Sequence, residues 1–137
     1  MSFRSRNPFL RLALLGDAAA SGAAGLLMAA GAGPLAGPLG LPEELLRYAG
    51  LALLPYAALV ARLGTRPDPA RGAVWAVIAV NACWAADSLL LLLSGWVAPT
   101  ALGTAFVLAQ AAVVAAFAVA QHAGLRRGAQ GMAVAHG

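Results

Sequence analysis

The chain has 137 residues, of which 61% are hydrophobic and only 10% are charged, whereas a soluble domain has about 25% charged residues. With a mean hydropathy of +0.80, a chain of this length could not cover its own surface in water, which excludes an ordinary soluble protein. The net charge of +4 comes from arginines at the ends of apolar runs, and this placement indicates contact with lipid headgroups and no nucleic-acid partner.

Four apolar segments predict an all-α fold, an integral membrane four-helix bundle made by residues 1–127. A membrane span takes roughly 20 residues, and the Ala- and Leu-rich segments lie at about 10–31, 44–61, 73–94 and 101–123, a composition that favours helix. The basic start resembles a signal peptide, but Asp17 interrupts the apolar run, so we expect this segment to remain as the first helix. Residues 31–42, 64–72 and 95–100 predict connections, and residues 128–137 predict a flexible cytoplasmic tail.

The arginines predict the orientation of the helices, because basic residues favour the cytoplasmic side of a membrane. Arg47 alone lies near one side, and the other side carries Arg4, Arg6, Arg11, Arg62, Arg66, Arg71, Arg126 and Arg127. We therefore expect both termini and the middle loop in the cytoplasm. A shift of 64 residues also lays Asp17 on Asn81, which suggests two pseudo-repeated helical hairpins of the same orientation.

Asp87 and Asn81 are polar residues inside the third apolar segment. A charged carboxylate at bilayer depth costs roughly 2.5–3.5 kcal/mol, so we expect Asp87 to face protein. Asn81, Trp84 and Ser88 share one helix face, beside Asp87. One interpretation is a proton or cation site, and the other is interhelical hydrogen bonding that fixes packing; the sequence leaves both open.

Asp17 begins a stripe of small residues at every fourth position, which predicts a close helix contact along Ser21, Gly25, Ala29 and Gly33. Asp17 and Asn81 lie at similar distances from the cytoplasmic side, so they could meet, with a protonated Asp17 donating to Asn81. Gln110 could face Asp87, as a packing residue or a ligand. Pro55 predicts a kink in the second helix, and the Tyr56 hydroxyl beside it could turn inward.

No catalytic constellation, cofactor site or metal site is predicted. The two histidines, His122 and His136, fall at a helix end and in the tail, and a zinc site would require several ligands together. The sequence also lacks a glycine-rich phosphate loop and a Ser-His-Asp set. We therefore expect the chain not to be an enzyme.

Three stretches, DAAASGAAGLL, LLRYAGLALLPYAALVA and LLLLLSGWVAPTALGTAFVLAQA, resemble small uncharacterised four-helix proteins of the bacterial inner membrane over nearly the whole chain. The resemblance implies a multi-pass inner-membrane location, and it transfers no activity to this chain because none is known for the group. The small multidrug exporters are similar in size and place an acid in their first helix, as Asp17 stands here, but the rest of their pattern is missing.

Two main functions remain open. The first is a non-enzymatic accessory or structural subunit, which would form a homo-oligomer or join other membrane-protein subunits. The alternative is a small proton- or cation-coupled transporter or channel that uses Asp87 and Asp17 as titrating groups. A membrane enzyme acting on lipid or quinone is a third and weaker hypothesis.

Overall fold

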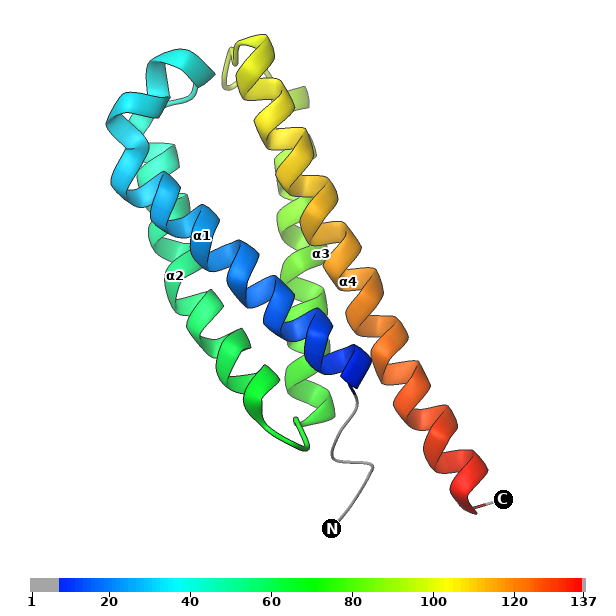
Figure 1. Cartoon of the computed structure of the whole chain (residues 1–137). Helices are drawn as coiled ribbons and strands as arrows, with labels where there is room; N and C mark the ends of the chain where they lie inside the picture. The colour runs from blue at the N-terminus through cyan, green and yellow to red at the C-terminus, as the bar shows by residue number, and fades with distance from the viewer. Residues whose placement is uncertain (1–7, 137) are drawn as a thin grey trace.

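In the computed structural model, residues 8–136 form four helices joined by short connections (Figure 1). The helices are α1 (Pro8–Leu39), α2 (Glu43–Thr65), α3 (Arg71–Ser94) and α4 (Ala101–His136). The structure describes the backbone of residues 8–136 and the side chains of residues 8–127. All four helices are long and apolar enough to cross a membrane, and the predicted all-helical fold is confirmed.

The end of α1 was predicted too early. The helix continues past residue 31 to Leu39, although it contains Pro34 and Pro38. Each proline removes one helical hydrogen bond and favours bending, and α1 bends near this end (Figure 1). The helix stops at Gly40, whose φ of 66° is left-handed. The N–H groups of Gly40 and Leu41 bond back to carbonyls of the last turn at 3.1 and 3.2 Å, a cap that requires a residue such as glycine.

The other helix boundaries lie closer to the predictions, except at the end of α4. Pro42 directly precedes α2. α2 runs to Thr65 instead of residue 61, and α3 begins at Arg71 instead of residue 73. The predicted end of α4 at residue 123 is wrong, because the helix continues to His136 through the expected flexible tail. Isolated glycines cost a helix only about 1 kcal/mol each, so the alanine-rich segment that follows residue 127 can remain helical.

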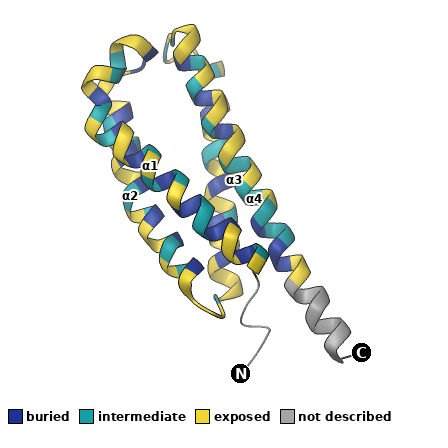
Figure 2. Ribbon diagram, viewed as in Figure 1, coloured by how far each residue is buried: buried dark blue, intermediate teal, exposed yellow. Residues whose placement is uncertain are grey.

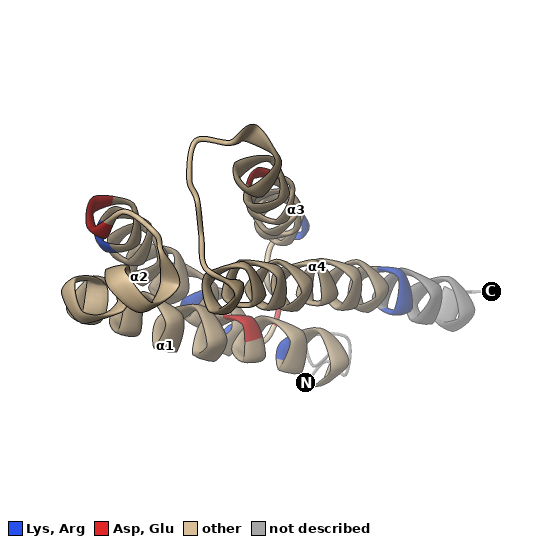
Figure 3. Ribbon diagram, turned by 90° about the horizontal axis from the view of Figure 1, so that it is seen from above, with Lys and Arg blue, Asp and Glu red and all other residues tan. Residues whose placement is uncertain are grey.

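The four helices pack as two hairpins. α1 packs along α2, α3 packs along α4, and the two hairpins meet mainly where α1 contacts α4. α2 and α3 hardly touch each other, and in the view of Figure 3 α3 lies beyond α4 on the side away from α1. Two repeats related by a two-fold axis would make the α1–α4 and α2–α3 contacts equal. The packing therefore departs from the predicted repeat symmetry.

Two apolar clusters form the core, one toward each end of the bundle. The first contains Leu10, Leu14, Ala18, Val60, Val74, Val77 and Leu125. The second contains Met28, Ala32, Leu39, Leu41, Leu46, Leu53 and Val107. Exposed residues cover the outer faces of the helices (Figure 2), and many of them are large and apolar, such as Leu93 at 83% exposure. Large exposed apolar surfaces of this kind mark contact with lipid or with another protein.

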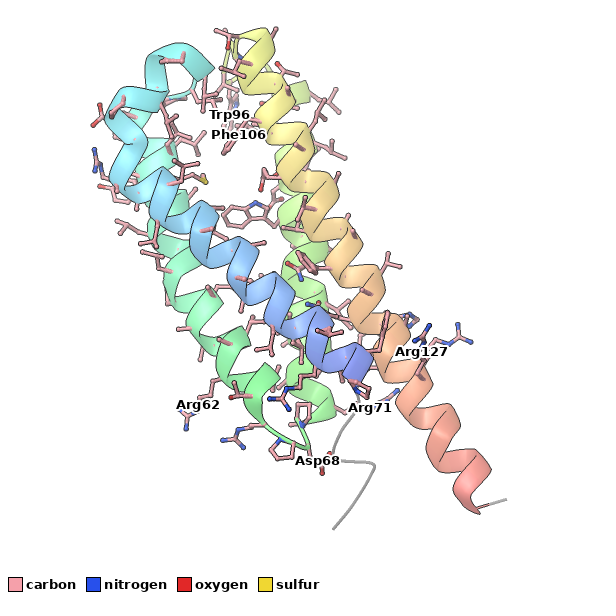
Figure 4. All side chains as sticks on the ribbon, in the orientation of Figure 1. Arg62, Asp68, Arg71, Trp96, Phe106 and Arg127 are labelled. Carbon is pink, nitrogen blue, oxygen red and sulfur yellow. The ribbon has the colours of Figure 1, made fainter. Side chains whose placement is uncertain are left out.

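The two ends of the bundle differ in charge. Arg62, Asp68, Arg71 and Arg127 gather at the end where α1 begins and α2 ends (Figure 4). Trp96 lies toward the opposite end (Figure 4). Between these ends most of the ribbon carries neither basic nor acidic residues (Figure 3). This distribution matches the basic side that the sequence predicts.

Thr100 connects the two hairpins at the end opposite the basic one. Its N–H donates to the carbonyl of Leu39 at 3.0 Å, and its hydroxyl donates to the carbonyl of Pro38 at 2.7 Å. The same hydroxyl accepts the N–H of Gly103 at 3.1 Å, which caps the start of α4. A Cβ on Gly103 would collide with the carbonyl oxygen of Leu39, so glycine is required for this close approach.

Candidate functional site

The centre of the bundle holds a group of polar side chains to which every helix contributes. Asp17 and Ser21 come from α1, Tyr56 from α2, Asn81 from α3 and Gln121 from α4. We call these five residues the interhelical polar cluster. Asp17 and Gln121 are 0% exposed and Asn81 is 2% exposed. Tyr56 packs against both apolar clusters.

Asp17 accepts hydrogen bonds from all four other members of the cluster. Its Oδ1 accepts from the Ser21 hydroxyl at 3.0 Å. Its Oδ2 accepts at 2.8 Å from each of the Tyr56 hydroxyl, the Asn81 Nδ2 and the Gln121 Nε2. The four partners of the Asp17 carboxyl group therefore come from all four helices. Three of these hydrogen bonds converge on Oδ2, and one reaches Oδ1.

The donors of the cluster are also bonded to one another. The Asn81 Nδ2 lies 3.1 Å from the Gln121 Oε1, and the Tyr56 hydroxyl lies 3.0 Å from the Asn81 Oδ1. Tyr56 has one hydroxyl proton, so it can donate to Asp17 or to Asn81, but not to both at once. No buried side-chain nitrogen or oxygen among the described residues lacks a hydrogen-bond partner.

The cluster agrees in part with the sequence predictions. Asp17 and Asn81 do meet, but Asn81 donates to Asp17, whereas we predicted a protonated Asp17 that donates. Tyr56 turns inward as suggested. Gln121 was missed, although it lies on the buried stripe of α4, which runs at helical spacing through Val107, Ala111, Gln121 and Leu125.

A second polar group joins α3 to α4. The Trp84 Nε1 donates to the Gln110 Oε1 at 2.7 Å, and the Gln110 Nε2 donates to the Ser88 hydroxyl at 2.8 Å. That hydroxyl in turn donates to the Trp84 carbonyl at 2.7 Å. The predicted shared face of Asn81, Trp84 and Ser88 is therefore turned toward protein. Both side-chain hydrogen bonds of Gln110 are formed on this face. Gln110 therefore does not approach Asp87 as we expected.

Asp87 does not face the rest of the chain, contrary to our expectation. It is exposed, as are Cys83 and Ser94 on the same side of α3. The physical reason is that α3 packs closely against α4 alone, so only a narrow stripe of α3 is buried. Ser88 belongs to that stripe, and Asp87, one position earlier, points about 100° away from it. Asp17 and Asp87 therefore do not form one site within the chain.

The small-residue stripe of α1 is a contact face, as predicted, and α2 occupies much of it. Ser21 and Gly25 are buried, whereas Gly33 is exposed. A Cβ on Gly50 of α2 would lie 2.7 Å from the Gly25 carbonyl oxygen and would collide with the Ala29 nitrogen. This part of the stripe is thus not free for a second copy of the chain, and the predicted homo-oligomer loses one of its arguments.

Pro55 lies inside α2 on its exposed side. It precedes Tyr56, which carries the α2 contribution to the interhelical polar cluster. His122 packs edge-on against Trp75, with 5.3 Å between the ring centres. The side chain of His136 lies outside the described residues. Within the part of the chain that is described, no three His, Cys, Asp or Glu residues gather to hold a metal ion.

No protein-family model, curated protein or solved structure matches this chain.

Proposed function

We propose that the chain is a multi-pass membrane protein of the bacterial inner membrane with both ends in the cytoplasm. The four apolar helices, the apolar outer surface and the single basic end support insertion in this direction. The bacterial assignment depends on the resemblance of the sequence segments alone. A reporter fused after residue 137 that is active only in the cytoplasm tests the orientation, and activity of a periplasmic reporter at that position would contradict it.

Within the membrane, we propose that the protein acts as a non-enzymatic accessory or structural subunit. The observation that supports this role is the convergence of hydrogen bonds from all four helices on Asp17. Its two carboxylate oxygens receive four donors from four helices, and its side chain is fully buried. A carboxylate used in this way holds helices together, because each interhelical hydrogen bond stabilises one packing arrangement. The exposed face of α3 then remains for contact with other subunits.

Native mass spectrometry of the protein after gentle extraction from its source membrane tests this role. A stable complex with another membrane protein is the expected result. A monomer or homo-oligomer that retains a small molecule would contradict the accessory role and favour transport. The Asp17→Asn variant is the control for assembly, since an amide can still accept at one atom and should leave the complex intact.

A proton-coupled transporter is the second candidate, and the two acceptors of Tyr56 favour it. If Asp17 took up a proton, its Oδ2 could donate to the Tyr56 hydroxyl while Tyr56 donated to the Asn81 Oδ1, without movement of the heavy atoms. Proton flux in vesicles that contain the purified protein tests this candidate. Flux that disappears in Tyr56→Phe would support it, and flux equal to that of empty vesicles would refute it.

A further inference from the structure

The outward side of α3 is a long helix face that the rest of the chain leaves uncovered. It contains Ala73, Ala76, Val80, Cys83, Asp87, Leu90 and Ser94, all of them exposed. We call these seven residues the outer face of α3. Their spacing alternates between three and four residues, which places them in one line along a helix that pairs with another helix. α2 does not cover this face, because α2 and α3 hardly touch.

Asp87 makes this face unusual. It is the only acidic residue of α3, and no hydrogen bond joins it to another residue in the described part of the chain. It lies two turns, about 10 Å, from the Ser94 end of the helix. In a hydrocarbon layer of about 30 Å, this position is inside the membrane. Acidic residues at such depth normally face protein and have a partner.

The described residues do not supply a cation for Asp87. Arg47 is the arginine at the same end of the bundle, but its Nη2 pairs with Glu43 at 2.8 Å and its Nη1 donates to the Ala29 carbonyl at 3.1 Å. The other described arginines lie at the opposite end. A second copy paired through the same face would bring one Asp87 against another, and like charges repel. Charge complementarity therefore favours a different protein over a second copy.

We propose that the outer face of α3 binds a transmembrane helix of another protein, and that this helix carries a Lys or Arg at the depth of Asp87. The proposal rests on the proposed accessory function and names the chemistry of the partner. The small side chains toward the basic end of the face allow a close approach of two backbones. The pair of opposite charges fixes the register of the two helices, since a displaced partner would leave both charges unpaired.

Cys83 provides a direct test, because it lies on the same face one turn from Asp87. Two synthetic transmembrane helices of Leu and Ala are used as probes, each with one cysteine. The fourth residue after the cysteine is Lys in one probe and Leu in the other. The cysteine and this residue thus have the same order and spacing along the probe as Cys83 and Asp87 have along α3. Each probe is mixed with the full-length protein in phosphatidylcholine vesicles, and mild oxidation is followed by measurement of the protein–probe disulfide.

The Lys probe should give about tenfold more protein–probe disulfide than the Leu probe, because polar contacts between membrane helices favour association by that order. The preference should disappear in Asp87→Asn and persist in Asp68→Asn, which changes an exposed acid of the loop before α3. If Asp87→Asn does not fold, the comparison of the two probes on the unchanged protein still decides the question.

Equal disulfide yields with the two probes would overturn the proposal. Formation of Cys83–Cys83 disulfides in preference to either probe would also overturn it and would identify a second copy as the occupant. The accessory function fails separately, when native mass spectrometry finds no complex. A native complex together with equal probe yields would leave that function standing and reject only the basic partner helix.

Discussion

Substitution of Asp17 tests the interhelical polar cluster most directly. In Asp17→Asn, the amide oxygen can occupy the position of Oδ2 and accept from Tyr56, Asn81 and Gln121, while the amide nitrogen donates to the Ser21 hydroxyl. Asp17→Ala removes the acceptor altogether. Both substitutions replace the titratable carboxyl group by a neutral side chain. The difference in stability between the two variants therefore measures the loss of the acceptor together with the small cavity that alanine leaves.

The expected difference follows from the three hydrogen bonds that cross between helices. Interhelical hydrogen bonds in a membrane protein contribute about 0.6 kcal/mol each on average, so Asp17→Ala should be less stable than Asp17→Asn by about 2 kcal/mol. The loss of stability is limited, because two hydrogen bonds remain in Asp17→Ala. Asn81 and Gln121 stay bonded to each other at 3.1 Å, and the Tyr56 hydroxyl still donates to the Asn81 Oδ1. Gln121 suffers most, since its Nε2 retains only the Ala13 carbonyl at 3.5 Å.

Reversible unfolding in detergent micelles, followed by circular dichroism, gives the free energy of unfolding of each variant. Asp87→Asn and Asp87→Ala are the matched controls. Because Asp87 is exposed, the free energies of unfolding of these two variants should differ by less than about 0.5 kcal/mol. Equal stabilities of Asp17→Asn and Asp17→Ala, within the same limit, would refute the structural role of the cluster.

Three further substitutions should lower the free energy of unfolding, and the same assay measures each. Gly50→Ala should lower the free energy of unfolding by about 1–3 kcal/mol, because its Cβ would overpack the contact with α1. Its control, Gly72→Ala, should be neutral or stabilising, because nothing lies within 4 Å of the new Cβ. Equal effects of the two substitutions would contradict the close packing of α2 on α1. Gly103→Ala should separate the end of α1 from the start of α4, and an unchanged stability would show that this approach is looser than described. Gln110→Leu should cost about 1–2 kcal/mol, because the Trp84 N–H loses its buried acceptor; no loss would mean that this N–H finds another partner.

The number and type of the helices could be predicted from the sequence, because apolar runs of about 20 residues suit a membrane span. The end of α1 could not, since Pro34 and Pro38 are normally read as helix stops. Here the helix accepts both prolines and ends at the left-handed Gly40. The buried neighbours of that glycine, Leu39 and Leu41, belong to the second apolar cluster, and such tertiary packing is not visible in a local pattern.

The candidate site was harder to predict than the fold. Counting residues from the helix ends gave the depth of Asp17 and Asn81, and their contact is confirmed. Depth does not give the direction of a side chain, and Asp87 points away from the other helices of its own chain. In a soluble helix the polar side faces water and so reveals the buried side. In α3 nearly every side is apolar, so the sequence does not show which residues contact α4.

Among the described residues, the side-chain hydrogen bonds between the two hairpins lie at two levels, at the interhelical polar cluster and at Thr100. Two rigid bodies joined at two points retain one rotation, about the line through those points. In this protein that rotation would swing α3 relative to α2, where the helices hardly touch, and would break the hydrogen bond between the Tyr56 hydroxyl and the Asn81 Oδ1. The interface with the least packing is thus also the one at which the bundle opens with the smallest loss of hydrogen bonds.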